Sequence, residues 1–167
     1  MDFEVIQGDI AAQSADVLVN AANTSLHMGS GVAGALKRAA GAGLDDEAVS
    51  KGPVELGGVA TTDAYDLDAE YVIHAAAMPP GGSSTADSIR DATRNALEEA
   101  DALGCASMVL PALGCGIAGF DFEDGVRIIC ETIGAFDPDS LEDVRLIAYS
   151  DEDYERIRGV ADEVRTA

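Results

Sequence analysis

Short apolar runs alternate along this chain with longer stretches that place apolar residues at helical spacing. Several runs are too continuous for a strand with one face in water, so they indicate a sheet that is covered on both faces. The expected strands are Phe3–Ile6, Val17–Val19, Val59–Ala64, Tyr71–Ala75, Met108–Leu110 and Val144–Tyr149. The expected helices are Val32–Ala40, Leu44–Lys51, Ser84–Leu103, Phe122–Phe136 and Glu152–Arg165. This alternation predicts an α/β fold in three layers, α/β/α, around a mostly parallel sheet.

The helix expected over Ser84–Leu103 has the clearest end signals. Ser84 and Asp87 have the spacing of a capping box, with Asp in the place of Glu. Gly104 stands where the C-terminus of a helix favours glycine.

We expect residues 1–167 to form a single domain, because the chain contains no low-complexity linker and no internal repeat. No stretch reaches the roughly 18 apolar residues of a membrane span. The first residues also lack the pattern of a secretory signal peptide. The sequence therefore predicts a cytoplasmic monomer that does not contact membranes.

The charge of the chain is strongly acidic. There are 31 acidic residues against ten basic ones, which gives a formal net charge of −21. Self-repulsion of this size destabilises a compact protein in dilute buffer, whereas molar salt shortens the Debye length to ~3 Å and screens the repulsion. We therefore expect the cytosol of a halophile. Because no Lys/Arg patch could neutralise phosphates, a nucleic-acid partner is not expected.

The cysteines and histidines do not have the spacing of a metal site. Cys105, Cys115 and Cys130 match no zinc signature. An odd number of cysteines in a cytosolic chain is typical of reduced thiols that pack as small apolar residues. We expect neither a metal nor another cofactor. His74 is expected in the core, or next to residues that contact a ligand without contacting the ligand itself. In either place its ring nitrogens would be hydrogen-bonded to the backbone.

Two glycine-rich loops follow expected strands, at the edge where α/β sheets bind ligands. Gly29–Gly34 and Gly114–Gly119 both have the spacing G-x-G-x-x-G. Glycines let the main chain approach a phosphate closely, and the helix behind each loop offers free N–H groups. An acidic protein needs such local donors to bind an anion, and two loops in one small domain suggest two walls around one diphosphate.

A Rossmann dinucleotide site is one alternative, because G-x-G-x-x-G is its fingerprint. That site needs a strand running directly into the glycines and an acidic residue about 20 positions further on. The first loop fails because Asn20 and Gly29 are too far apart in the sequence. After the second loop, Asp137 and Asp139 fall in a turn that follows a helix. An NAD(P) oxidoreductase is therefore disfavoured.

Several segments together resemble the macro domain, a family that binds ADP-ribose and includes the Appr-1-p processing proteins. The segments are Gly8–Ile10, Val19–Asn23 with its N-A-A-N, the loop to Gly31–Val32, Leu110–Gly119, and Ile147–Tyr149 at the end of the last strand. Their order and spacing match over essentially the whole chain. The chain is identified as a member of a halophilic archaeal type of this family. The resemblance implies a sheet of six strands in mixed directions.

The resemblance implies an adenine site around Asp9. The carboxylate of Asp9 would accept a hydrogen bond from the adenine amino group, Ile10 would lie against the base, and Tyr149 would stack on it. A carboxylate suits this task because it repels the carbonyl oxygen of guanine. The alternative use of Asp9 is a helix N-cap or an Asx-turn after the first strand.

For the rest of the ligand, the resemblance implies contacts from asparagine and from both glycine loops. Asn23 would hydrogen-bond the distal ribose, because an amide both donates and accepts, while Asn20 would brace the loop. The first loop would wrap the distal ribose and one phosphate with Gly29, Ser30, Gly31 and Val32. In the second loop, backbone N–H groups would bind the diphosphate, from Gly114, Cys115, Gly116 and Ile117. The next residues of this loop, Ala118, Gly119 and Phe120, would also contact the ligand.

Catalysis is the open part of this interpretation, because many macro domains remove ADP-ribose from proteins or small molecules. Strongly active members often carry an acid after the valine of the first loop, where this chain has Ala33. They also tend to carry an aromatic residue after the isoleucine of the second loop, where it has Ala118, with Phe120 nearby. Asn23 cannot act as a general base, because an amide does not titrate near neutrality. A substrate phosphate could activate water instead.

His27 and Cys115 are the other candidate reactive groups. A histidine changes charge near neutral pH, so His27 is a candidate catalytic residue beside Asn23; a solvent-facing loop histidine is the alternative. Helix N–H groups near Cys115 would favour its thiolate, but no histidine lies near it in the sequence, so we expect a packed thiol.

The sequence therefore predicts a protein that binds ADP-ribose, related ADP-ribosyl metabolites or ADP-ribosylated proteins, with weak hydrolase activity at most. The alternative is a competent hydrolase of ADP-ribosyl esters or O-acetyl-ADP-ribose.

Overall fold

The computed structural model describes residues 1–115 and 120–167. Its strands are β1 (Glu4–Gln7), β2 (Val17–Asn23), β3 (Val59–Asp63), β4 (Tyr71–Met78), β5 (Ser107–Leu110) and β6 (Asp143–Ala148). Its helices are η1 (Ile10–Ala12, a 3-10 helix), α1 (Gly31–Ala40), α2 (Leu44–Lys51), α3 (Ala86–Ala102), α4 (Phe122–Ala135) and α5 (Asp151–Thr166). Among these helices, none has both the length and the apolar character that crossing a membrane requires.

The six strands form one sheet in the order β1-β6-β5-β2-β4-β3. In the described parts of the chain, neighbouring strands run parallel except β3 and β4, which pair antiparallel. This is the mixed, mostly parallel sheet that the sequence predicts. Because parallel strands end at one edge, the segments that follow β1, β2, β5 and β6 all begin on the same side of the molecule.

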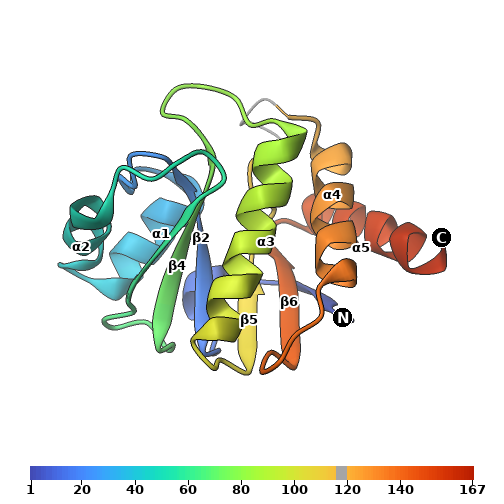
Figure 1. Ribbon diagram of the computed structural model, residues 1–167, viewed down its shortest axis with the longest axis horizontal. Helices are drawn as coiled ribbons and strands as arrows, with labels where there is room; N and C mark the ends of the chain where they lie inside the picture. Colours follow the sequence, from blue (N-terminus) through green and yellow to red (C-terminus); the bar gives the residue numbers. More distant parts are fainter. Residues whose placement is uncertain (116–119) are drawn as a thin grey trace.

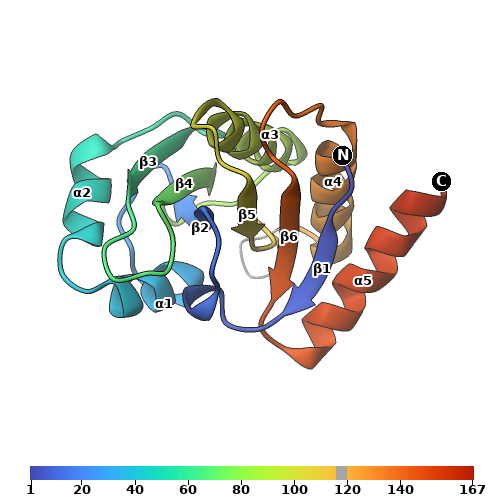
Figure 2. The same cartoon turned by 90° about the horizontal axis from the view of Figure 1, so that it is seen from below.

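Helices cover both faces of the sheet (Figures 1 and 2). α3, α4 and α5 pack on one face, and α1, α2 and η1 pack on the other, each with its own apolar cluster. β2 explains why two layers are needed: Val17 and Val19 enter the first cluster and Leu18 the second, and all three are fully buried. Successive strand residues point to opposite faces, so a continuous apolar run needs cover on both sides.

All six strands and all five longer helices expected from the sequence are present, with ends that differ by a few residues. The largest difference is in β2, which continues to Asn23 by pairing with β4. The N-A-A-N segment is therefore strand rather than loop. The pairing with a neighbour that is itself buried outweighs the low strand propensity of asparagine and alanine. The 3-10 helix η1 was not expected.

The start of α3 also differs from the expectation. The capping box is formed by Thr85 and Ser88, one residue later than the Ser84 and Asp87 of the sequence prediction. Ser84 is buried and its hydroxyl donates instead to the carbonyl oxygen of Gly114. Gly104 has the positive φ of 77° expected just after a helix.

Candidate ligand site

A pocket of about 380 Å³ opens where the ends of β1 and β6 meet α1. Its lining residues are Gly8, Asp9, Ile10, Gly31, Val32, Ala35, Arg38, Ile147 and Tyr149. Asp9, Ile10, Gly31, Val32 and Tyr149 are residues that the sequence assigns to the ligand. Their convergence comes from the parallel sheet, which brings the ends of β1 and β6 together, and from α1, which packs beside them.

A groove of about 430 Å³ lies elsewhere, between α3 and α4. It is lined by helix residues such as Arg90, Arg94 and Ile128, and by none of the residues that the sequence assigns to a ligand. Ligands of parallel sheets bind beyond the carboxyl ends of the strands. The pocket beside Asp9 is therefore the candidate site, although the groove is slightly larger.

Asp9 has a structural role as well as a place in the pocket. It is the N-cap of η1, and its Oδ1 accepts a hydrogen bond from the N–H of Ala11 at 2.9 Å. The N-cap alternative for Asp9 is thus correct for one oxygen of the carboxylate. The side chain is exposed and lines the pocket, so the second oxygen is available to a ligand. Ile10, the next residue, is buried at the pocket floor.

Tyr149 stands at the rim of the pocket with 81 % of its surface exposed. It follows β6 directly, and the next residue, Ser150, caps α5 by accepting a hydrogen bond from the N–H of Asp153. The backbone of Tyr149 is therefore held between a strand end and a helix start. An exposed aromatic side chain on a fixed backbone can stack on a planar ligand at low entropic cost.

The first two residues of α1, Gly31 and Val32, line the same pocket. Ser30 is the N-cap of this helix, but its hydroxyl makes no capping hydrogen bond. The starts of α3, α4 and α5 are each capped by a side chain, from Thr85, Asp121 and Ser150, whereas α2, which begins after Gly43, also lacks such a cap. The N–H groups at the start of α1 therefore keep their capacity to bind an anion, with the positive end of the helix dipole behind them.

The loop before α1 is fixed by a carboxylate from α2. Oδ1 of Asp45 accepts a hydrogen bond from the N–H of Met28 at 2.9 Å, and Oδ2 forms an ion pair with Lys37 at 3.3 Å. The hydrogen bond from Met28 lowers the pKa of the Asp45 carboxyl. Asp45 thus ties the loop to α1, a role that the sequence did not indicate.

Asn23 is the last residue of β2, and the oxygen of its side-chain amide is already hydrogen-bonded within the protein. Its Oδ1 accepts hydrogen bonds from the N–H of Ser25 at 2.9 Å and from the Ser25 hydroxyl at 2.5 Å. The sequence predicts an amide that both donates to a ribose and accepts from it. With Oδ1 occupied by Ser25, the Asn23 amide approaches a ligand as a donor through Nδ2.

Asn20 does not brace the loop, contrary to the sequence prediction. Its side chain is 1 % exposed, and its Nδ2 lies 3.0 Å from Nδ1 of His74 on β4. Nε2 of His74 lies 3.0 Å from the Thr62 hydroxyl, which donates to the carbonyl oxygen of Asp63. His74 is in the core as expected, but side chains satisfy its ring rather than the backbone. Burial lowers the pKa of His74 to about 4.

The second glycine loop begins at a position that only glycine fits. Gly114 has a positive φ of 67°, and a β carbon there would lie 2.9 Å from Cβ of Ser84 and 3.0 Å from Cβ of Ala77. The Ser84 hydroxyl donates to the Gly114 carbonyl oxygen. The loop is therefore pinned by the residue that the sequence predicts as a helix cap.

Cys115 is a packed thiol, as expected. Its Sγ donates to the carbonyl oxygen of Leu113 at 3.2 Å, and burial raises its pKa to about 12, so the nearby helix does not activate it. Phe120 packs with Cys115 over Gly125 at the start of α4. The expected phosphate contacts of Gly116, Ile117, Ala118 and Gly119 lie outside the described residues.

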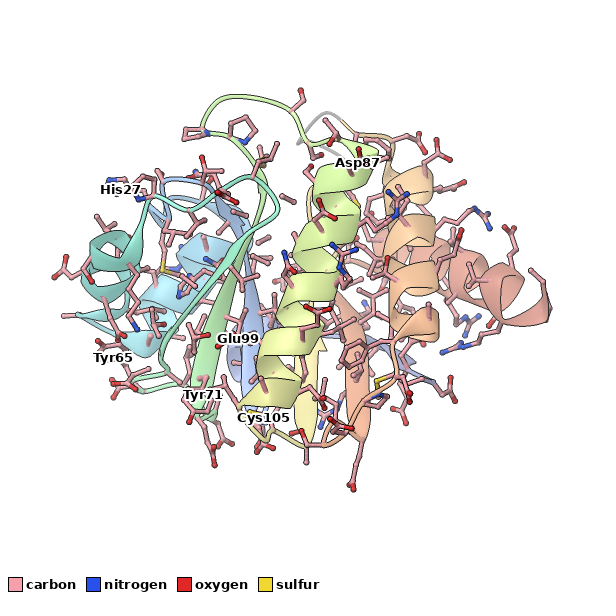
Figure 3. The ribbon with its side chains drawn as sticks, viewed as in Figure 1. His27, Tyr65, Tyr71, Asp87, Glu99 and Cys105 are labelled. Atoms are coloured by element: carbon pink, nitrogen blue, oxygen red, sulfur yellow. The ribbon has the colours of Figure 1, made fainter. Side chains whose placement is uncertain are left out.

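His27 is exposed on the loop that follows β2, at the end of the molecule occupied by α2 (Figure 3). Its backbone N–H donates to the Ser25 hydroxyl at 3.3 Å. It is not among the residues that line the pocket. This placement matches the alternative of a solvent-facing loop histidine. In the part of the chain that the structure describes, no group of three metal-binding side chains converges.

The sequence did not indicate Gly8, Ala35, Arg38 and Ile147 as lining residues. Ala35 and Arg38 could have been found from their spacing, because residues four and seven positions after Gly31 share its face of the helix. Ile147 could have been found from the alternation along β6, since it precedes Tyr149 by two.

Comparison with known proteins agrees with this fold and site. The model of the family described as Macro domain matches residues 19–129. An uncharacterized protein of Mycobacterium tuberculosis is 40% identical over 151 residues, which are 90% of this chain and 42% of that protein. The chain thus spans about two fifths of the length of this relative. An uncharacterized protein of Aquifex aeolicus is 39% identical over 91% of this chain and 93% of its own length.

Solved structures are similar over nearly the whole chain. A variant of the Oceanobacillus iheyensis macrodomain with ADPR superposes with a TM-score of 0.86 at 26% identity, covering 98% of this chain and 93% of that one. The Trypanosoma brucei macrodomain in complex with ADP-ribose has a TM-score of 0.82 at 26% identity, covering 93% of this chain and 67% of that one. From its sequence match and its fold together, this chain belongs to the macro domain family.

Proposed function

We propose that this macro domain binds ADP-ribose, with the adenine in the pocket beside Asp9 and the diphosphate at the start of α1. The observation that carries the proposal is that five residues assigned to the ligand from the sequence line one pocket. The Trypanosoma brucei macrodomain, solved with ADP-ribose, supports the choice of ligand at the level of the family. ADP-ribosyl metabolites and ADP-ribosylated proteins would enter through the same ADP-ribose group.

The geometry suits the two ends of this ligand differently. At the base end, Asp9 offers one carboxylate oxygen to the adenine amino group, and Tyr149 offers an aromatic face. At the phosphate end, uncapped N–H groups of α1 supply positive partial charge without a basic side chain. This division matters in a chain of net charge −21, whose overall field repels an anion.

Calorimetric titration with ADP-ribose in molar KCl tests the proposal. We expect saturable binding with a dissociation constant of about 1–100 μM, a free energy of roughly −8 to −5 kcal/mol. Ribose 5-phosphate, which lacks the adenosine half, should bind far more weakly. The absence of binding heat with ADP-ribose at millimolar concentration would refute the proposed function.

A second candidate function is hydrolysis of ADP-ribosyl esters. Two observations favour weak turnover over strong turnover: Ala33, where active relatives often carry an acid, is only 6 % exposed, and the Oδ1 of Asn23 is occupied by Ser25. Asn23 would orient the distal ribose as a donor, and a phosphate of the substrate would have to activate the water.

Release of free ADP-ribose from protein modified on acidic residues tests this second function. If the parent releases ADP-ribose and Asn23→Ala does not, the hydrolase activity belongs to this site. If both release ADP-ribose at the same rate, this site is not the source of the activity. No release above the spontaneous rate would leave a binding module.

A further inference from the structure

Arg38 is the exception among the basic residues. Of the ten, Lys37, Lys51, Arg90, Arg94, Arg127, Arg145, Arg156, Arg158 and Arg165 each form an ion pair with a carboxylate. Within residues 1–115 and 120–167, Arg38 forms none, and the four remaining residues include no acid. In a chain with 31 acidic residues, a guanidinium without a carboxylate partner is notable. It lines the candidate pocket.

The guanidinium of Arg38 lies back along α1 toward the start of the helix. Its Nη1 would stand 3.2 Å from a β carbon on Gly34, one turn earlier in the helix. Gly31, Ala35 and Arg38 line the pocket in succession along one face of α1. The pocket thus extends along α1 from Gly31 to Arg38 in its third turn.

The pocket that Arg38 lines consists mainly of the residues assigned to the base. The pocket does not include Gly114 or Cys115, the described start of the second phosphate loop. It includes instead the apolar floor of Ile10 and Ile147 together with Asp9 and Tyr149, which suits a flat ring. Asp9 and Arg38 line the same pocket without forming an ion pair, so both remain available to a ligand.

We propose that Arg38 is a specificity-determining residue that stacks its guanidinium on the adenine ring, on the side of α1. A guanidinium is planar and weakly hydrated, so it stacks on an aromatic face at a lower desolvation cost than an ammonium group. Tyr149 and Arg38 then contact the base from β6 and from α1, while Asp9 reads its amino group. This inference rests on the proposed function, because it assigns a role within the same ADP-ribose site.

Three variants test the proposal by calorimetry with ADP-ribose in molar KCl. Arg38→Gln should weaken binding about 5- to 20-fold. Arg38→Lys should recover only part of this loss, because lysine restores the positive charge but not the planar guanidinium group. Arg94→Gln is the matched control: it makes the same change in net charge in the groove between α3 and α4, and should bind as the parent does. Equal affinity of Arg38→Gln and the parent would overturn the proposal.

The resonance of the Arg38 Nε–H distinguishes stacking from a phosphate contact. We assign it as the signal that disappears from the ¹H–¹⁵N spectrum in Arg38→Lys. On addition of ADP-ribose it should move upfield, into the shielding region over the ring. A downfield shift would indicate a hydrogen bond to phosphate and would overturn the proposal, as would an unchanged signal. If the parent itself does not bind ADP-ribose, the proposed function fails, whereas binding without an effect of Arg38 refutes this inference alone.

Discussion

Gly34 lies so close to Gly29 that a β carbon on Gly34 would stand 2.9 Å from the Gly29 carbonyl oxygen. Gly29 lies in the loop between β2 and α1, so this contact limits how closely that loop approaches the helix. Gly34→Ala should push the loop away from the helix and crowd the Arg38 guanidinium, which lies 3.2 Å from the same β carbon. Binding of ADP-ribose should weaken about 10-fold, because inserting a methyl group into a packed contact costs roughly 1–3 kcal/mol. Calorimetry measures the change in affinity.

Gly159→Ala is the matched control for Gly34→Ala. Gly159 is also inside a helix, α5, but a β carbon there meets nothing within 4 Å. This variant should raise the free energy of unfolding by about 0.5–1 kcal/mol and leave binding unchanged. If Gly34→Ala bound ADP-ribose as tightly as Gly159→Ala does, the contact with Gly29 would not position the loop.

Ser84 holds the start of the second glycine loop through the Gly114 carbonyl oxygen. Ser84→Ala should lower the free energy of unfolding by about 1–3 kcal/mol, because a buried acceptor loses its donor, and it should also weaken ADP-ribose binding. Ser140→Ala also removes serine hydroxyl hydrogen bonds, to the carbonyl oxygens of Asp101 and Cys105 at 3.0 Å each, but near the start of β5 rather than at the loop that follows it. Equal losses of affinity in the two variants would contradict the assigned role of Ser84.

The two roles of Asp9 can be separated by Asp9→Ser. Serine is also a good N-cap, so its hydroxyl can keep the hydrogen bond to the Ala11 N–H and the stability of η1. The carboxylate that would accept from adenine is lost, and affinity for ADP-ribose should fall about 10- to 100-fold, the worth of a hydrogen bond to a charged group. Competition assays should show no change for ribose 5-phosphate. Equal losses for both ligands would refute the adenine assignment.

The fold was predictable from the sequence because its signals are local and consistent. Val17-Leu-Val19 could only be a strand covered on both faces, and α3 carried its own start and stop residues. The start of α3 was placed one residue too early for a physical reason. Ser84 and Thr85 are both good capping residues, but the Ser84 hydroxyl donates to the Gly114 carbonyl oxygen, so Thr85 caps the helix. That bond joins residues 30 positions apart, which no local pattern reveals.

The site was predictable only in part. The resemblance identified Asp9, Gly31 and Tyr149, which the structure brings into one pocket. It did not indicate Arg38, because a lone arginine on a helix usually faces water and has a carboxylate partner. That Arg38 lacks such a partner depends on where all the other charges lie, which only the three-dimensional structure gives.

His74 makes stability depend on pH. Burial lowers its pKa to about 4 in the folded protein, against 6.5 for an unperturbed histidine. The folded pKa is depressed, so the unfolded chain takes up the proton first, and stability is lost as pH falls from about 6.5 toward 4. The loss reaches about 3 kcal/mol, at 1.36 kcal/mol for each pKa unit. The free energies of unfolding of the parent and of His74→Gln, measured with denaturant, should approach each other as the pH falls over this range. A difference independent of pH would contradict the assignment.

The net charge of −21 makes stability depend on salt. Raising KCl from about 0.1 M to about 3 M should raise the melting temperature by roughly 10 °C. Screening removes about 3 kcal/mol of repulsion from the folded state, and each kcal/mol of stability raises the melting temperature of a domain of this size by about 2–4 °C. Thermal unfolding followed by circular dichroism measures this. A melting temperature that is unchanged or falls with salt would contradict the expectation of a halophilic protein.

A crystal structure of this protein with ADP-ribose tests the central claim most directly. We expect the adenine between Asp9, Arg38 and Tyr149, with its amino group on the Asp9 carboxylate and the diphosphate on the N–H groups at the start of α1. Adenine bound outside this pocket, or a diphosphate held by side chains away from α1, would contradict it.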